Sequence, residues 1–587
     1  VLTWFAAPLL LVVLVVISYR DAPNNVFHFD DGRNITRHPP VMVETLTLEN
    51  VVNAGRQSFL PSRPLPSMTF AVDWWRGGGS ARPFQHTNIG IHALTAIAVY
   101  ALLLIVLART QNPRSVAVPA AALAAALWAT HPIQVQAVTY VVQRMASMAT
   151  LFTVLAVAAY ILARGKTGWR SYVLFAAAAI SWFLGLVSKE NAAIALFLVL
   201  LAEYGVIRHG QSLVRASRDK ILLALPLVVV LFVVVDFWTG AGPLSARFLP
   251  GYELRDFTLG ERLLTQPRVI AFHLSQVLWP VPSRFSIEHD FHVSTGIFSP
   301  VETFAALAAL IVWCAIGIWT FFQRSLRVLG FCLLWVPATL AIESSFVALE
   351  MVFEHRMHMA SVGLAGLAAL ALTWLLRKVR SYRTVVLGAP VVVIALLILS
   401  TSQKVPVWQS TLRLAQNGVE NAPNNARSWA NLAGVLQNEG HSWEEIMLAV
   451  TKALELNPSE FRALHIRAMY LVSAGRLEEA GQVLERLEPR ADRDHSVLNT
   501  VGMLRLAERD YTAAIAQFKE VAQLDPFRPE FKYNLALSYE LAGQCEAALA
   551  TWQAYLRQAT NAQRIASVNQ RLKRNFATEG GRCFGKQ

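Results

Sequence analysis

The hydrophobic pattern divides the chain near residue 402. Before that point, long apolar stretches alternate with polar connections, and after it apolar residues recur at the spacing of amphipathic helices. Each apolar stretch is roughly long enough to cross, or nearly cross, a bilayer, which predicts a polytopic helical region of about eleven spans. These stretches lie near residues 2–17, 88–108, 117–130, 145–163, 172–187, 191–207, 221–238, 301–321, 328–343, 357–376 and 384–400.

The second region repeats with a period of 34 residues from about residue 424. GRLEEAGQVLERL and RDYTAAIAQFKEVAQLDP resemble tetratricopeptide repeats, and prolines two periods apart close the second helix of their units. An all-α chain is therefore expected, with a membrane domain over 1–401, a linker over 402–423, a tetratricopeptide-repeat α-solenoid over 424–575 and a tail over 576–587. The repeating positions are Gly434, Ala468, Gly502 and Ala536, and Ile446, Ala480, Ala514 and Ala548; the prolines are Pro458 and Pro526.

The composition agrees with a membrane protein. Hydrophobic residues make up 54% of the chain and charged residues only 16%, which is too apolar for a soluble enzyme of this size. The net charge of +13 arises without a long basic run, so nucleic acid is not expected as a partner.

The basic residues predict which side of the membrane each loop faces. With a cytoplasmic N-terminus and an uncleaved first helix, the inner loops hold fifteen Lys or Arg and one acidic residue, Asp219. Residues 18–87, residues 239–300 and the repeats then lie outside, as in a bacterial inner-membrane protein with a periplasmic tail. Residues 266–281 are interpreted as re-entrant or interfacial, because counting them as a span would reverse the later loops. The inner loops are 109–116, 164–171, 208–220, 322–327 and 377–383.

The four cysteines lack the spacing of a zinc site. Cys314 and Cys332 fall in apolar spans. Cys545 and Cys583 lie in the tail, where one disulfide and two free thiols are both compatible with the sequence.

Polar motifs gather at the outer ends of the predicted spans. After the first span, FHFDDGRNITRHPPV places the adjacent carboxylates Asp30 and Asp31 beside basic residues. A simple Asp-Asp-Gly turn is the alternative interpretation of the tripeptide. Snorkelling would explain Lys and Arg at both ends of spans, but not His, Asp and Glu on one side only. The other motif residues are Arg63, His86, Asn88, His92, His131, Arg144, Lys189, Glu190, Glu354, His355 and Arg356.

The ordered series FDD, RPLPSMTF, HTNIGIHAL, HPIQVQAVTYVVQR, SKEN, RLLTQPRV and EHRMHMASVG, followed by repeats, resembles the transmembrane and tetratricopeptide-repeat O-mannosyltransferases and their bacterial relatives, in the glycosyltransferase C superfamily. The resemblance covers nearly the whole chain. It implies an inverting transfer of a sugar from a polyprenyl-phosphate donor to Ser or Thr hydroxyls of an exported protein.

On this resemblance, Asp30 or Asp31 is the general base and nearby cations neutralise the leaving phosphate. His358, Met359 and Ala360 replace a Tyr-Leu-Pro run that is common in the relatives, and SKEN replaces Lys-Glu-Gln, so donor and acceptor identity stay open. The expected substrate-binding residues are Arg63, His86, His131, Arg144, Lys189, Glu190, Arg268, Glu354, His355 and Arg356.

No cofactor is expected apart from the lipid-linked donor. His28, Asp30, Asp31, His38 and His131 could supply metal ligands, but they lack a fixed ligand spacing. Two other functions remain open: a transferase or ligase with a lipid or polysaccharide acceptor, and a non-catalytic membrane scaffold or transporter whose repeats bind a partner.

Overall fold

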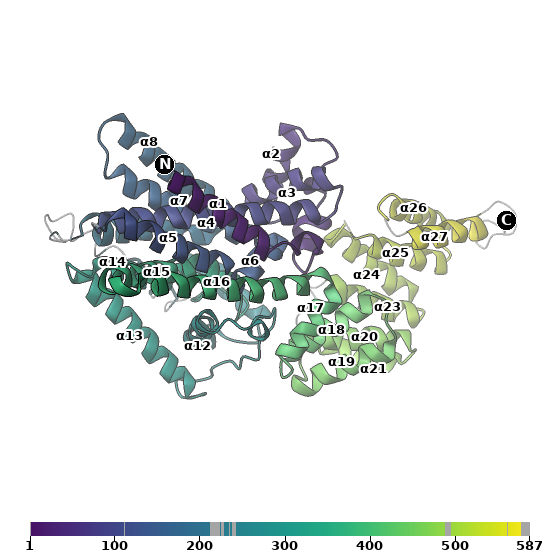
Figure 1. The fold of residues 1–587 in the computed structure, drawn as a ribbon. Helices are drawn as coiled ribbons and strands as arrows, with labels where there is room; N and C mark the ends of the chain where they lie inside the picture. The colour runs from purple at the N-terminus through teal and green to yellow at the C-terminus, as the bar shows by residue number, and fades with distance from the viewer. Residues whose placement is uncertain are drawn as a thin grey trace. The chain divides into compact units, whose positions relative to one another are not determined.

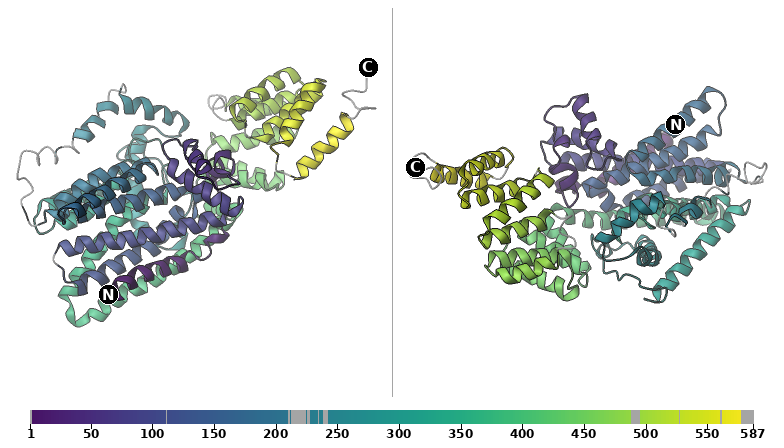
Figure 2. Two further views of the ribbon diagram at one scale, coloured as in Figure 1. Left: turned by 90° about the horizontal axis from the view of Figure 1, so that it is seen from above. Right: turned by 180° about the vertical axis from the view of Figure 1, so that it is seen from behind.

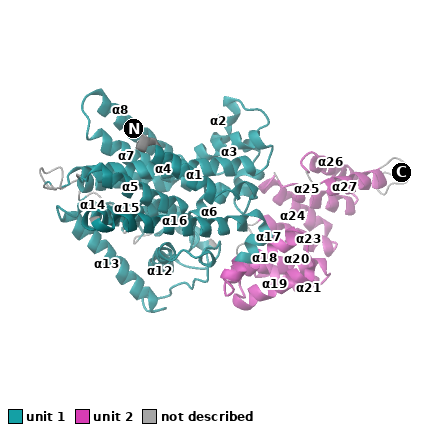
Figure 3. Cartoon of the chain, in the orientation of Figure 1, with its two compact units in different colours: residues 1–417 teal, residues 418–587 magenta. Residues whose placement is uncertain are grey.

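The computed structural model describes residues 2–110, 112–209, 211, 224, 228–233, 235–237, 242–487, 495–526, 528–559 and 562–576. Every regular element in these ranges is helical, which confirms the all-α expectation (Figure 1). The chain divides into two compact units, residues 1–417 and 418–587 (Figure 3).

Unit 1 contains long helices joined by short helical turns. Most of the long helices lie side by side (Figures 1 and 2). The α-helices are α1 (Leu2–Ser18), α2 (Leu48–Arg56), α3 (Pro64–Gly77), α4 (Arg82–Arg109), α5 (Arg114–Thr130), α6 (Val135–Thr139), α7 (Arg144–Ala163), α8 (Trp169–Leu186), α9 (Ala195–Ala202), α11 (Pro243–Phe248), α12 (Leu259–Leu278), α13 (Glu302–Phe322), α14 (Arg327–Leu340), α15 (Met357–Lys378) and α16 (Arg383–Lys404). α17 (Thr411–Asn421) contains the division between the units.

The short helical turns are η1 (Ala22–Asn24), η2 (Gly32–Thr36), η3 (Pro39–Val41), η4 (Pro132–Gln134), η5 (Val141–Gln143), η6 (Glu190–Ile194), η7 (Glu203–Ile207), η8 (Leu249–Leu254), η9 (Pro282–Arg284), η10 (Glu354–Arg356), η11 (Arg380–Tyr382) and η12 (Val405–Gln409). Two of them, η2 and η7, are π-helical. Most of these turns stand at the ends of long helices or in the loops between them, so they connect the candidate spans.

Seven helices in the described residues are long and apolar enough to cross a membrane, fewer than the eleven expected. An eighth span results if Arg114–Thr130 and Pro132–Thr139, which meet at 54°, are counted together. Pro132 explains this break, because proline disfavours a helical residue before it. The expected spans 2–17 and 328–343 are shorter apolar helices, and most of 221–238 lies outside the described residues. The seven are Arg82–Arg109, Val141–Ala163, Trp169–Leu186, Glu190–Ile207, Glu302–Phe322, Glu354–Lys378 and Arg383–Gln409.

The centre of unit 1 is packed around α5, which contacts α1, α4, α15 and α16. Its buried side is formed largely by alanines, including Ala120, Ala121, Ala124 and Ala125. Helices in lipid gain little from burying apolar surface against one another, so small side chains that allow close approach are favoured at such interfaces. The alanine-rich sequence of α5 therefore suits its central position.

Unit 2 consists of successive helix pairs. The second helices of the pairs begin at Trp443, Leu477, Tyr511 and Cys545, each 34 residues after the one before. All eight repeating positions identified in the sequence are buried. The helices are α18 (Ala426–Asn438), α19 (Trp443–Leu456), α20 (Phe461–Ser473), α21 (Leu477–Glu485), α23 (His495–Ala507), α24 (Tyr511–Leu524), α25 (Pro529–Leu541), α26 (Cys545–Leu556) and α27 (Ala562–Asn575).

The turns inside the pairs share one backbone conformation. Gly440, Gly475 and Gly543 have φ values of 78°, 73° and 74°, and Arg509 takes the corresponding position with φ 65°. Cys545 is disulfide-bonded, Cys314 and Cys332 are free, and Cys583 lies outside the described residues.

Candidate functional site

The two adjacent acids after α1 form part of a tight turn. The carbonyl of His28 accepts the N–H of Asp31 at 2.9 Å, and the carbonyl of Phe29 accepts that of Gly32 at 3.1 Å. Phe29 has a φ of 42°, which costs a residue with a side chain about 1–3 kcal/mol. The surrounding contacts maintain this turn despite that cost.

The carboxylates of Asp30 and Asp31 occupy different environments. Asp31 is buried, and its two oxygens accept the N–H groups of Val142 at 2.7 Å and His28 at 2.8 Å. Burial raises the pKa of Asp31 to about 8, although these two N–H groups act in the opposite direction. Asp30 is exposed, and its own N–H donates to the Tyr140 hydroxyl at 2.9 Å. Asp31 therefore anchors the turn and Asp30 faces outward.

Aromatic residues pack around this turn. The His28 ring nitrogen Nε2 lies 2.7 Å from the carbonyl oxygen of Trp408, and Tyr140 stacks on the Trp408 ring at 5.7 Å. Burial lowers the pKa of His28 to about 4, so its ring is neutral at physiological pH. His38 Nε2 also lies 2.7 Å from a backbone carbonyl, that of Gln57. Within the described residues, no three His, Cys, Asp or Glu side chains form a group that could hold a metal ion.

Residues 131–144 connect this turn to other segments of unit 1. His131 Nδ1 accepts the N–H of Ile133, so Nε2 carries the proton and donates to the Val277 carbonyl at 3.1 Å. Gln136 Oε1 accepts the N–H of His355 at 2.8 Å and lies 3.0 Å from its ring Nδ1. Residues 131–136 therefore contact α12 and η10, while Tyr140 and Val142 contact the first loop.

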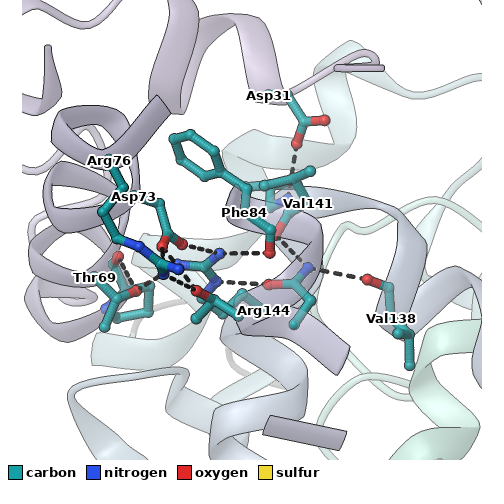
Figure 4. A network of polar contacts seen from close by, with 12 residues as sticks. Asp31, Thr69, Asp73, Arg76, Phe84, Val138, Val141 and Arg144 are labelled. Carbon is teal, nitrogen blue, oxygen red and sulfur yellow. Dashed lines mark hydrogen bonds and ion pairs between the residues drawn. The ribbon is translucent and has the colours of Figure 1, made fainter. Parts of the chain in front are cut away.

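Arg144 begins α7 and is fully buried in a polar network (Figure 4). Its guanidinium lies 2.6 Å from Asp73, donates to Asn88 Oδ1 at 2.6 Å and donates to the Phe84 carbonyl at 3.0 Å. It also lies over the Phe70 ring, 4.7 Å from the centroid. A charge in a membrane span is costly unless it is paired, and Arg144 is paired within the protein.

Two ion pairs follow on the same side of unit 1. Arg63 contacts Glu190 at 2.8 Å and is partly exposed. Lys189 contacts Glu343 at 2.5 Å, and both are buried. Burial acts to raise the pKa of Glu343, but the charges of Lys189 and Arg356 hold it below its usual range. Arg63 and Lys189 are therefore close to each other, and Arg356 is close enough to act on Lys189 and Glu343.

Glu354, His355 and Arg356 form η10 and are all buried. Glu354 accepts the Ser286 N–H at 3.0 Å and lies 3.2 Å from His289. Arg356 donates to the carbonyls of Met351 and Glu350. These contacts fix the segment that precedes α15.

Arg262, on α12, holds the non-helical loop between α14 and α15. All three of its nitrogens donate to backbone carbonyls of this loop, at 2.9 Å to Ser345, 2.6 Å to Leu349 and 2.6 Å to Glu343. Such satisfaction of carbonyls is required of irregular backbone near lipid. Arg262 therefore positions Glu343 opposite Lys189.

The remaining expected residues lie apart from this network. Arg268 donates to the His292 carbonyl at 2.8 Å and lies over the Phe291 ring. His86 is exposed on α4.

Sequence reasoning missed Asp73, Glu343, Arg262 and Gln136, which partner the expected residues. An ionisable residue inside an apolar run was the available signal, as in FAVDWW and LAIESS.

No protein-family model matches the chain, and no curated protein matches it significantly.

Proposed function

We propose that unit 1 is a glycosyltransferase C type membrane enzyme that moves a sugar from a polyprenyl-phosphate donor to Ser or Thr hydroxyls of an exported protein. The main support is the Asp30–Asp31 turn, where one carboxylate is buried and bonded while its neighbour is exposed. Asp30 takes the acceptor proton as general base. The acceptor oxygen then attacks the anomeric carbon from the side opposite the phosphate, whose bond to that carbon breaks with inversion.

The cations have two roles in this proposal. Arg63 is partly exposed and contacts the leaving phosphate directly, while Lys189 and Arg356 are buried behind it and add positive potential. Arg144 is a positioning residue, because each of its nitrogens is bonded within the protein.

The helix pairs of unit 2 form a tetratricopeptide-repeat solenoid that recruits the acceptor or an assembly partner. The 34-residue recurrence of helix starts and the burial of the small repeating residues support this fold. The disulfide at Cys545 supports an extracytoplasmic, oxidising location for the repeats.

The test is mass spectrometry of exported proteins from cells that express the wild-type chain or the double variant D30N/D31N. The double variant is expected to abolish glycosylation while still inserting in the membrane. D21N is the matched control, because Asp21 is another partly exposed acid of the same loop and is paired with Arg20 at 3.5 Å. Transfer by D30N/D31N at the wild-type rate would refute the mechanism.

Deleting residues 424–587 separates the protein acceptor from a lipid or polysaccharide acceptor. Under our proposal, protein glycosylation falls steeply, whereas an enzyme with a lipid acceptor keeps transferring sugar to lipid. An unchanged glycan profile in a knockout would favour a scaffold.

A further inference from the structure

The side of α12 that faces the protein buries polar side chains beside the apolar residues Val269 and Ile270. Arg262, Gln266, His273 and Gln276 are all buried there. Arg262 donates to three loop carbonyls, and Gln276 donates to Glu354 at 3.3 Å. A helix on the surface of a soluble domain keeps such charged and amide side chains mainly on its outward side.

The outward side of α12 and the residue after it are apolar and exposed. Leu263, Leu278 and Trp279 have exposed fractions of 47%, 82% and 68%. The neighbouring turn before α13 exposes Phe298, and α13 exposes Phe304. Together these five residues define the α12 outer face. A large exposed apolar patch marks a surface that another apolar phase covers.

Hydrogen bonds place the C-terminus of α12 level with the ends of two candidate spans. The carbonyl of Val277 accepts from His131, directly after α5, and that of Pro280 accepts from Ser400 at 2.8 Å, in the last two turns of α16. The N-terminus of α12 has a capping box between Thr258 and Glu261, both at the protein surface. Both ends of α12 therefore have polar surroundings.

We propose that α12 lies in the plane of the outer membrane–water interface, with the α12 outer face buried in lipid. Lipid is the occupant because α12 packs against α13, a candidate span whose exposed residues Ile311 and Trp319 continue the same apolar surface. Trp279 at the end of α12 matches the enrichment of tryptophan at membrane interfaces. This inference does not depend on transferase activity.

The test uses cysteine variants reconstituted into liposomes. Cys314 and Cys332 are replaced by Ala, and an environment-sensitive fluorophore is attached to L263C or L278C. S80C, in an exposed loop, is the water control, and I311C, within α13, is the lipid control. The parent chain without an introduced cysteine measures background labelling, and thermal unfolding confirms that each variant folds.

L263C and L278C are expected to be quenched several-fold less by iodide than S80C. They should be quenched most strongly by lipids whose nitroxide lies near the headgroup, and I311C by lipids whose nitroxide lies deep in the chains. Iodide quenching equal to that of S80C would overturn the proposal, because the face would then meet water. Shielding from both iodide and lipid nitroxides would also overturn it, because a second copy of the chain would then cover the face.

Discussion

The Asp31 carboxylate accepts the N–H of Val142 at 2.7 Å and so attaches the first loop to the segment that precedes α7. Two residues later, at the start of α7, Arg144 joins α3 to α4 through Asp73 and Asn88. The position of the exposed Asp30 therefore depends on a backbone hydrogen bond to a residue more than one hundred positions away in the sequence.

Single substitutions should separate the roles of the two acids. At low pH, where the protonation of Asp31 adds little, D31N replaces one acceptor oxygen by an amide donor that faces a backbone N–H, so we expect it to lower the free energy of unfolding by about 1–3 kcal/mol. D30N should leave thermal unfolding unchanged and abolish sugar transfer. Thermal unfolding in detergent and a transfer assay measure the two effects. Equal destabilisation by both variants would contradict this division.

The stability of the wild-type chain should depend on pH through Asp31. Burial raises the folded-state pKa of Asp31 to about 8, above the unfolded value of about 3.9. The folded state therefore binds more protons between these values, and the free energy of unfolding falls as pH rises through this window, by at most about 1.4 kcal/mol per pH unit. Thermal unfolding should show that the advantage of wild type over D31N shrinks from pH 5 to pH 8 and then levels off. If the stability advantage of wild type over D31N instead grew with pH, folding would favour the ionised Asp31 carboxylate, and the prediction would be wrong.

The buried pair Lys189–Glu343 should show strong coupling. Removing one partner, as in K189M or E343Q, leaves the other charge buried and should cost about 3–5 kcal/mol. The double variant K189M/E343Q should lose less than the sum of the two single losses. A double-mutant cycle of thermal unfolding measures this coupling, and simple additivity would exclude a direct interaction.

Arg509 occupies a turn position where the other three helix pairs have glycine. Its φ of 65° is unfavourable for a residue with a side chain, so R509G should stabilise the turn by about 1 kcal/mol. Hydrogen exchange of α23 and α24 in the full-length chain should slow. G475A is the matched control and should speed exchange in α20 and α21, because its φ of 73° disfavours alanine. Faster exchange in R509G would contradict the prediction.

At Gly502, the second helix of the same pair, α24, approaches too closely for a methyl group to fit. A Cβ there would lie 2.6 Å from the Phe518 ring, which is fully buried. G502A should therefore destabilise the pair by about 1–3 kcal/mol. In contrast, G481A meets only an ordinary contact at 3.9 Å and should stabilise α21. We expect the thermal unfolding temperature to fall for G502A and to rise for G481A.

The helical class, the apolar segments and the 34-residue period can be predicted from the sequence alone. These properties depend on local spacing, since a span needs a continuous apolar run and a repeat needs small residues where its helices meet. The repeating positions Gly434, Ala468, Gly502 and Ala536 are buried for this reason.

Packing between distant segments sets which polar residues are bonded and which are exposed. Asp30 and Asp31 are adjacent and chemically identical, yet Asp31 is buried and accepts the Val142 N–H, whereas Asp30 is exposed. The partners Asp73, Glu343 and Arg262 come from distant helices. Exposure and charge pairing depend on contacts in the packed chain, so they cannot be predicted from the spacing of residues along the sequence.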